Sequence, residues 1–117
     1  MSDKTDMHLL RLWREVTLDV VKMDNKDLTM RQMSVLLIVY MDTDDDHTVR
    51  GLAAKLNVAK PVITRALDTL SQMGLLKRKR DDRDKRNVLV QRTVAGSVYL
   101  SELSSTISSA GAAIDAA

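Results

Sequence analysis

The stretch from Thr48 to Arg92 restricts the fold most, because two short helical patterns are followed directly by a hairpin pattern. Thr48 is a candidate N-cap for a helix over VRGLAAKLNV, and residues 57–59 then form a tight turn. A second helix begins with Pro61 at its first position and ends near Gly74, which can adopt a left-handed conformation. Two short helices joined by a turn make a helix-turn-helix. The inward positions are Leu52, Ala53, Leu56 and Val58, then Val62, Ile63, Ala66, Leu67 and Leu70.

A charged β-hairpin is predicted after the second helix. Two β-prone segments, residues 75–80 and 88–92, flank a turn over residues 81–87. That turn places three carboxylates among three cationic side chains. So many charges require either solvent or an oppositely charged partner.

Helices are also predicted on both sides of this stretch. Between Thr5 and Met23 the apolar residues cover far more than one helical stripe, so this helix either lies centrally or packs against a second chain. Thr29 is a candidate N-cap for the next helix, which we expect to be largely buried through Met33, Leu36, Leu37 and Tyr40. In the last helix, Leu103, Ile107, Ala110 and Ile114 form a seam suited to a partner helix.

The charge is concentrated in the middle of the chain. Residues 1–47 hold six Lys/Arg and ten Asp/Glu, residues 48–96 hold twelve and four, and residues 97–117 hold none and two. A strongly basic segment attracts polyanions, and the usual ones are nucleic acid and anionic membrane. The alternative is a basic face that is merely solvated.

The sequence lacks the residues that several other classes of function require. The chain has no cysteine, which excludes disulfides, thiolate zinc sites and cysteine nucleophiles. His8 and His47 lack metal-pair spacing, and the four glycines are isolated. We therefore expect neither an enzyme nor a cofactor. No apolar run is long enough to span a bilayer and the start lacks a signal-peptide pattern, so we expect a cytoplasmic protein.

The segment Asp42–His47 raises the question of calcium. Asp42, Asp44 and Asp46 fit the first three ligand positions of a calcium loop. However, His47 replaces the required glycine and Ala53 occupies the twelfth position, where glutamate is needed. We therefore expect a solvated acidic loop and no metal site.

The order helix-turn-helix, charged hairpin and long helix resembles a winged helix, and the residues are similar to those of the MarR family of bacterial transcription regulators. The matching stretch runs from about Leu28 to Gly96, through LTMRQMSVLLIV, GLAAKLNVAKPVITRALDTLSQMGLLKRKRD and DDRDKRNVLVQRTVAG. The most specific part is Asp81-x-Arg83-Asp84-x-Arg86 followed by Thr93-x-x-Gly96. The resemblance implies a homodimer whose recognition helices enter major grooves and whose wings reach minor grooves of a pseudo-palindromic site.

Candidate DNA contacts follow from this resemblance. On the recognition helix, Lys60, Thr64 and Arg65 lie off the buried stripe, and Arg65 is the preferred base contact. Val62 either contacts a thymine methyl group or packs in the core. In the family a wing aspartate holds an arginine for insertion into the minor groove. The matching residues are Asp84 and Arg86, with Arg83 and Lys85 as phosphate contacts, and the alternative for the pair is an ordinary surface ion pair.

Two departures from the family pattern affect what carries over. Family members usually have serine where Ala59 stands, so the recognition helix lacks a side-chain N-cap. This sequence has one predicted helix after the hairpin, whereas the family normally has a further C-terminal helix that completes its dimerisation domain and effector pocket. Its small-molecule sensing is therefore not carried over. A dimer can still form through the apolar surfaces of the outer helices, namely Leu9, Leu12, Trp13, Val16, Val20, Leu103, Ile107 and Ile114.

Together these features predict a mainly α fold with a small β-hairpin wing. We expect a single domain over residues 1–117, with residues 28–93 as the winged helix-turn-helix and residues 5–23 and 94–115 as dimerisation helices. The expected function is sequence-specific binding of double-stranded DNA by a nucleoid-associated homodimeric repressor. The alternative is a winged-helix interaction module that docks on an acidic protein partner.

Overall fold

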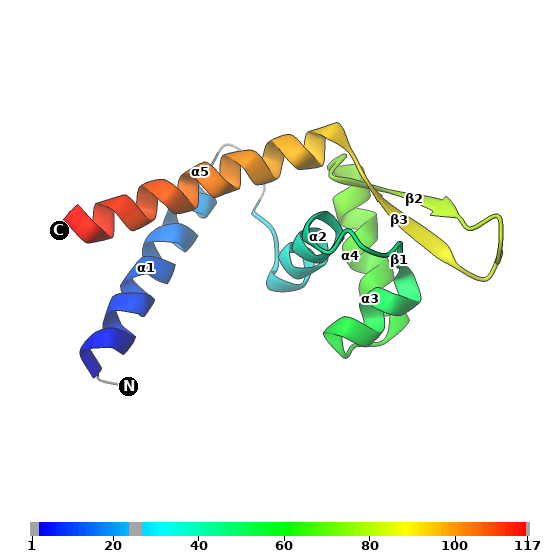
Figure 1. The fold of residues 1–117 in the computed structure, drawn as a ribbon, viewed down its shortest axis with the longest axis horizontal. Coiled ribbons are helices and arrows are strands. Elements are labelled where there is room, and N and C mark those ends of the chain that lie inside the picture. Colours follow the sequence, from blue (N-terminus) through cyan, green and yellow to red (C-terminus); the bar gives the residue numbers. More distant parts are fainter. Residues whose placement is uncertain (1–2, 24–26, 117) are drawn as a thin grey trace. The chain divides into compact units, whose positions relative to one another are not determined.

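The computed structural model describes residues 3–23 and 27–116 of the chain. The helices are α1 (Asp3–Lys22), α2 (Met30–Met41), α3 (Val49–Leu56), α4 (Lys60–Gln72) and α5 (Val94–Ala116), and the strands are β1 (His47–Thr48), β2 (Leu76–Arg80) and β3 (Val88–Arg92) (Figure 1). The expected mainly α fold with a hairpin wing is confirmed.

The chain forms two compact units. One comprises Leu28–Tyr99, which we call the winged-helix unit, and the other combines Met1–Asp27 with Leu100–Ala117, which we call the terminal-helix unit. The boundary at the C-terminal side lies inside α5, six residues beyond the predicted end of the winged helix-turn-helix at residue 93. That both units fold together as a single domain stays a prediction.

Side-chain caps explain where α2 and α3 begin. The Thr29 hydroxyl accepts the Gln32 N–H at 3.1 Å, and the Gln32 side chain accepts the Thr29 N–H at 2.9 Å. The Thr48 hydroxyl accepts the Gly51 N–H at 2.9 Å, and Asn57 ends α3 in the left-handed region with φ of 55°. Each contact satisfies backbone groups that a helix end leaves without a partner. Both predicted N-caps are therefore confirmed.

The recognition helix α4 starts without such a cap. Ala59 is its N-cap residue and has no side-chain hydrogen bond. Lys60 is therefore the first helical residue and Pro61 the second, so the placement of Pro61 at the first position was wrong by one residue. Proline is tolerated throughout this first turn because its missing N–H would have no partner there. Gly74 follows the helix with φ of 75°, as predicted.

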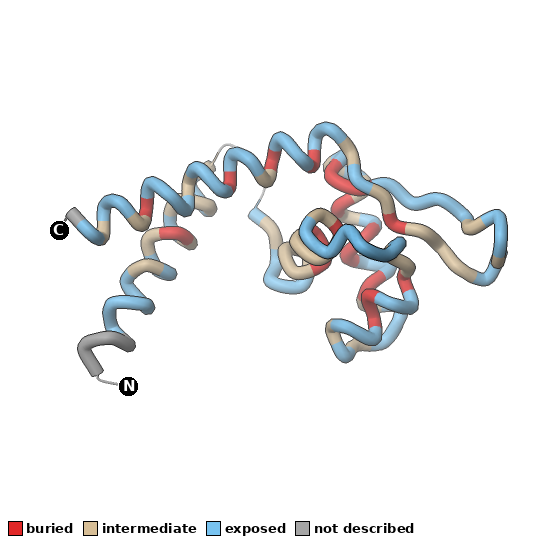
Figure 2. Tube along the Cα trace, in the orientation of Figure 1, coloured by how far each residue is buried: buried red, intermediate tan, exposed pale blue. Residues whose placement is uncertain are grey.

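The core of the winged-helix unit lies between α2, α3, α4 and the base of the sheet (Figure 2). Val35, Leu36 and Val39 form the buried stripe of α2, whereas the expected Met33, Leu37 and Tyr40 are only half-buried. The prediction for α2 was therefore wrong except at Leu36, because α2 packs through one stripe rather than around its circumference. Other fully buried side chains are Leu52, Ile63, Leu67, Leu70 and Leu76.

The sheet has a third strand that the sequence did not predict. Its order is β1-β3-β2, and both pairings are antiparallel. In β1, His47 lies opposite Val90 and Thr48 opposite Leu89. His47 therefore belongs to a strand, and the predicted acidic loop ends before it. This pairing anchors the N-terminus of α3 to the wing.

The junction between the wing and α5 explains the Thr93-x-x-Gly96 pattern. The Tyr40 hydroxyl donates to the Leu75 carbonyl at 2.6 Å and accepts the Thr93 N–H at 3.0 Å. The Thr93 hydroxyl donates to the Gly74 carbonyl at 2.7 Å and accepts the Gly96 N–H at 3.0 Å. A Cβ on Gly96 would lie 1.7 Å from the Tyr40 hydroxyl oxygen. Glycine is thus required for this close approach.

Candidate nucleic-acid interface

One face of α4 is buried and the other is open to a ligand. Ile63, Ala66, Leu67 and Leu70 point into the core, while the predicted contacts Lys60, Thr64 and Arg65 are exposed. Val62 is half-buried, so the structure leaves both of its expected roles open. Exposed cationic and hydroxyl groups on a helix of this kind are suited to phosphates and base edges.

A hollow of about 200 Å³ lies between the start of α2 and the exposed side of α4. We call it the α2–α4 hollow. It brings Arg31 close to Arg65, a juxtaposition that the sequence did not predict. The residues that line it are Thr29, Arg31, Gln32, Val62, Arg65, Ala66 and Thr69.

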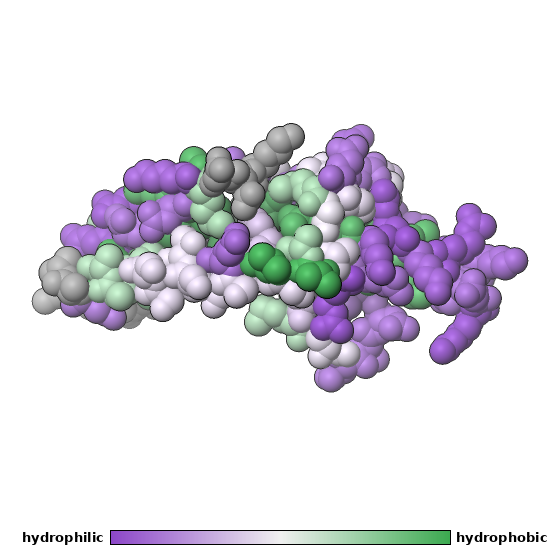
Figure 3. Space-filling view, turned by 90° about the horizontal axis from the view of Figure 1, so that it is seen from above, coloured by the Kyte–Doolittle hydropathy of each residue, from purple (hydrophilic) through white to green (hydrophobic). Residues whose placement is uncertain are grey.

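The wing is an exposed hairpin with a cationic surface. Hydrophilic side chains gather at the end of the view where the wing lies (Figure 3). In β2 only Leu76 is buried, and residues 77–80, all of them lysine or arginine, are exposed. Arg78 forms an ion pair with Asp68 of α4 at 2.8 Å, which ties the wing to the recognition helix.

At the tip of the wing, Asp84 holds Arg86. One Asp84 carboxylate oxygen, Oδ1, accepts the Arg86 backbone N–H at 3.1 Å and Nε–H at 3.0 Å, while Oδ2 accepts Nη2 at 3.0 Å. Arg86 is otherwise open, with 81% of its side chain exposed. Two parallel bonds to one carboxylate fix the plane of the guanidinium. The structure therefore brings together the predicted pair.

The same contacts shift both pKa values. The side-chain and backbone hydrogen bonds from Arg86 lower the pKa of the Asp84 carboxyl, and the positive charge of Arg50 adds to this effect. The carboxylate of Asp84 in turn raises the pKa of Arg86. Both groups thus stay charged at neutral pH. Among the described residues, Arg83 and Lys85 form no ion pair, and both are exposed at the tip.

The comparison with protein-family models gives one match. The model of the MarR family matches residues 28–88. This stretch contains the helix-turn-helix and most of the wing, and it is more than half of the chain. The chain belongs to the MarR family. Members of this family are transcription regulators rather than enzymes.

Solved structures share the fold of this MarR-family chain at low sequence identity. A mutant of S. aureus MepR has a TM-score of 0.79 at 17% identity, covering 99% of this chain and 83% of that one. Another MepR mutant, bound to an oligodeoxyribonucleotide, has a TM-score of 0.74 at 20% identity, covering 95% and 75%. A mutant MarR from E. coli has a TM-score of 0.72 at 23% identity, covering 94% and 78%. No curated protein matches the chain in sequence.

One cation near the wing tip of this MarR-family chain was not predicted from the sequence. Arg50 is exposed at the start of α3, and its charge acts on Asp84. The β1–β3 pairing explains this proximity, because it anchors the residues just before Arg50 to the wing. A strand of two residues leaves no periodic signal in a sequence.

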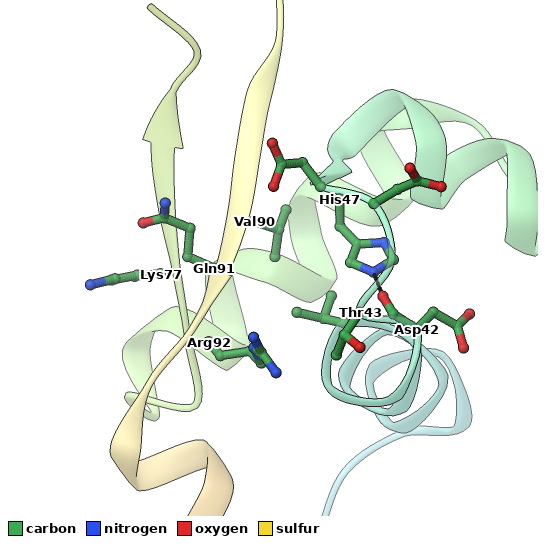
Figure 4. A pocket seen from close by; sticks show the side chains of 10 residues that line it. Asp42, Thr43, His47, Lys77, Val90, Gln91 and Arg92 are labelled. Carbon is green, nitrogen blue, oxygen red and sulfur yellow. Dashed lines mark hydrogen bonds between the residues drawn. The ribbon is translucent and has the colours of Figure 1, made fainter.

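A larger hollow of about 500 Å³ lies between the α2–β1 loop and β3, and its charges are mixed (Figure 4). His47 contacts the Asp42 carbonyl there, Arg92 extends toward the loop at Thr43, and Lys77 points away from it. Asp42 also pairs with Lys55 at 3.1 Å. Across residues 3–23 and 27–116, no three His, Asp or Glu side chains are grouped so that they could hold a metal ion.

The predicted dimer residues fall into three groups by burial within the terminal-helix unit. Val16 and Leu103 are buried in one chain, at 5% and 6% exposed, so they have little surface to offer a partner. Leu9, Trp13 and Ile107 are 51%, 52% and 44% exposed. Half-buried members are Leu12, Val20 and Ile114. In the described parts of the chain, no helix has the length and apolar character needed to cross a membrane.

Proposed function

We propose that this chain is a sequence-specific regulator that binds double-stranded DNA as a homodimer and represses transcription by occupying promoter DNA at the nucleoid. The observation that carries the proposal is the exposed Arg86, held by Asp84 at the tip of a cationic wing. An arginine whose orientation is already fixed loses little entropy when it enters a narrow minor groove. The proposal includes no small-molecule effector.

The recognition helix supplies the base contacts in this proposal. Arg65 extends from the exposed face of α4 and can bond two acceptors of a guanine in the major groove. Lys60 and Thr64 contact phosphates or base edges beside it. The exposed part of the Val62 side chain contacts a thymine methyl group. The MepR mutant bound to an oligodeoxyribonucleotide supports this docking, since that protein shares the fold.

Two copies of the chain are required because one recognition helix reads only a half-site. The exposed apolar residues of α1 and α5 support dimerisation, since single soluble chains rarely expose a large contiguous apolar surface. The proposed contacts are Leu9, Leu12, Trp13, Val20, Ile107 and Ile114. Val16 and Leu103 are buried within each chain and contribute to this interface by packing beneath the contact residues. A twofold dimer then places its two α4 helices on a pseudo-palindromic operator.

Enrichment of bound duplexes from a random pool tests this function and requires no assumed operator sequence. We expect a palindromic consensus whose half-sites lie about one helical turn apart. Arg65→Ala should relax the consensus at one position in each half-site, and a good bidentate contact is worth roughly 1–3 kcal/mol of discrimination. Retention of duplexes without any consensus would contradict sequence-specific recognition.

A further inference from the structure

The α2–α4 hollow joins two cationic side chains from different helices. Arg31 lies in the first turn of α2 and Arg65 in α4, and both are exposed. Neither forms an ion pair among the residues that the structure describes. No carboxylate lines this hollow. Two neighbouring guanidinium groups without a counter-charge attract an anion.

Two of the three uncharged polar side chains beside these arginines already have partners, and the third is the Thr69 hydroxyl. Thr29 and Gln32 form the reciprocal cap of α2, at 3.1 and 2.9 Å, so their side chains are used within the protein. The two arginines are the only charged residues that line the hollow, so they determine the sign of the charge that it attracts. A hollow on the wing differs, because Asp46, Asp81 and Asp82 line it together with Lys79, Arg80 and Arg83. Cations there have carboxylates nearby, whereas those of the α2–α4 hollow do not.

We propose that Arg31 binds a backbone phosphate of the DNA strand that borders the major groove occupied by α4. This inference rests on the proposed function, because Arg65 reaches from the same hollow toward the base edges. Phosphate contacts fix the register of a protein on the duplex without reading sequence. Arg31 is thus a positioning residue that sets how α4 enters the groove.

The hollow favours DNA over a free anion because it is continuous with the exposed face of α4. Val62 and Arg65 belong both to the lining and to the predicted recognition surface. A phosphate held at Arg31 therefore lies at the edge of that surface. The sequence did not show this, since the proximity of Arg31 to Arg65 arises only from the packing of α2 on α4.

Fluorescence anisotropy with the full chain tests the inference, using Arg31→Ala on the enriched operator and on a random duplex from about 50 to 300 mM salt. Each phosphate contact contributes about 0.9 to the slope of log K against log salt, so two contacts per dimer contribute about 1.8. We expect the slope to fall by that amount, with affinity reduced about tenfold or more on both duplexes. Arg31→Lys should retain most of the slope.

Lys55→Ala is the matched control. It removes the same charge from the winged-helix unit, but Lys55 is paired with Asp42 just beyond the other end of α2. The control should leave the slope near that of the wild type. An unchanged slope in Arg31→Ala, with wild-type binding intact, would overturn the inference. Absence of DNA binding by the wild type would instead overturn the proposed function.

A free-anion site is distinguished by a second measurement. Calorimetry with inorganic phosphate should show no saturable heat at millimolar concentration, because a single exposed anion gains little from two solvated arginines. Saturable binding that is lost in Arg31→Ala, together with an unchanged DNA slope, would assign the hollow to a small anion and overturn the DNA contact.

Discussion

At the scale of single residues, the proposed DNA contact of the wing depends on the hydrogen bonds between Asp84 and Arg86. A carboxylate facing a polyanion is repelled by it, so Coulomb's law alone predicts that removing Asp84 tightens binding. The hydrogen bonds at 3.0 Å predict the opposite, because they orient the guanidinium. The two effects have opposite signs and can be separated by experiment.

We predict that Asp84→Ala weakens operator binding about two- to fivefold, as expected for loss of a modest ordering effect. Asp82→Ala is the control, since Asp82 is an exposed carboxylate of the same turn. It should leave affinity unchanged or raise it. Anisotropy on one duplex at one salt concentration measures both variants. Tighter binding by both would show that Asp84 acts only as a negative charge and that the pair is an ordinary ion pair.

The lowered pKa of Asp84 sets the pH range of this contact. The ordinary pKa of an aspartate is 3.8, and the hydrogen bonds from Arg86 hold the pKa of Asp84 below this value. A carboxyl group with a lowered pKa in the folded state stabilises above its unfolded pKa and loses that effect as pH falls through the folded value. We therefore predict that the NMR signal of Arg86 Nε–H stays constant from about pH 5 to about pH 8 and moves only below about pH 4. A midpoint near neutral pH would contradict this contact.

At the scale of elements, a side-chain N-cap at the start of α4 should stabilise the protein. Ala59 caps the helix without a side-chain bond, and Pro61 has no N–H. The N–H that a side-chain cap at position 59 can reach is that of Val62, which in this structure donates to the Ala59 carbonyl at 3.0 Å and would share its hydrogen with a serine hydroxyl. We predict that Ala59→Ser raises the free energy of unfolding by about 1 kcal/mol, measured by urea denaturation. Thr48→Ala, which removes the equivalent cap of α3, should lower it by a similar amount. Equal stability of wild type and Ala59→Ser would contradict the role given to this cap.

The junction at Gly96 gives a second prediction for an element. A Cβ there would meet the Tyr40 hydroxyl at 1.7 Å and the Leu75 carbonyl oxygen at 2.4 Å. Gly96→Ala should therefore lower the free energy of unfolding by about 1–3 kcal/mol or more, as overpacking does. Gly111→Ala is the control in the same helix, because a Cβ at Gly111 would have no heavy atom of another segment within 4 Å. It should be neutral or stabilising, and equal destabilisation of both would exclude the packing explanation.

The elements differ in how well their sequence predicts them. Local signals such as the caps at Thr29 and Thr48 and the glycine at position 74 determined the helix ends. Strand β1 was missed because two residues next to an acidic loop show no alternation. Among the site residues, Asp84 and Arg86 are close in sequence and were found through the family pattern. Arg31 and Arg50 were not, because tertiary packing and strand pairing place them.

At the scale of the whole molecule, we propose that the terminal-helix unit forms the dimer interface. Trp13 of α1 is 52% exposed. A large apolar side chain exposed to this extent beside other exposed apolar residues indicates an interaction surface. We predict a dimer at tens of micromolar by light scattering and a monomer for Trp13→Glu, with weaker operator binding. Met41→Glu is the control, since Met41 is 71% exposed in the winged-helix unit. A monomeric wild type, or a Trp13→Glu protein that stays dimeric, would contradict this interface.

The salt dependence of DNA binding tests the central claim most directly. Fluorescence anisotropy would compare the DNA upstream of the protein's own reading frame with a random duplex of equal length from about 50 to 300 mM salt. Tight binding to the upstream region with a steep negative slope, and weak binding to the random duplex, is the predicted result. Equal binding to both would indicate an architectural protein without sequence preference. If neither duplex binds at low salt, the claim is wrong and the wing serves an acidic protein partner.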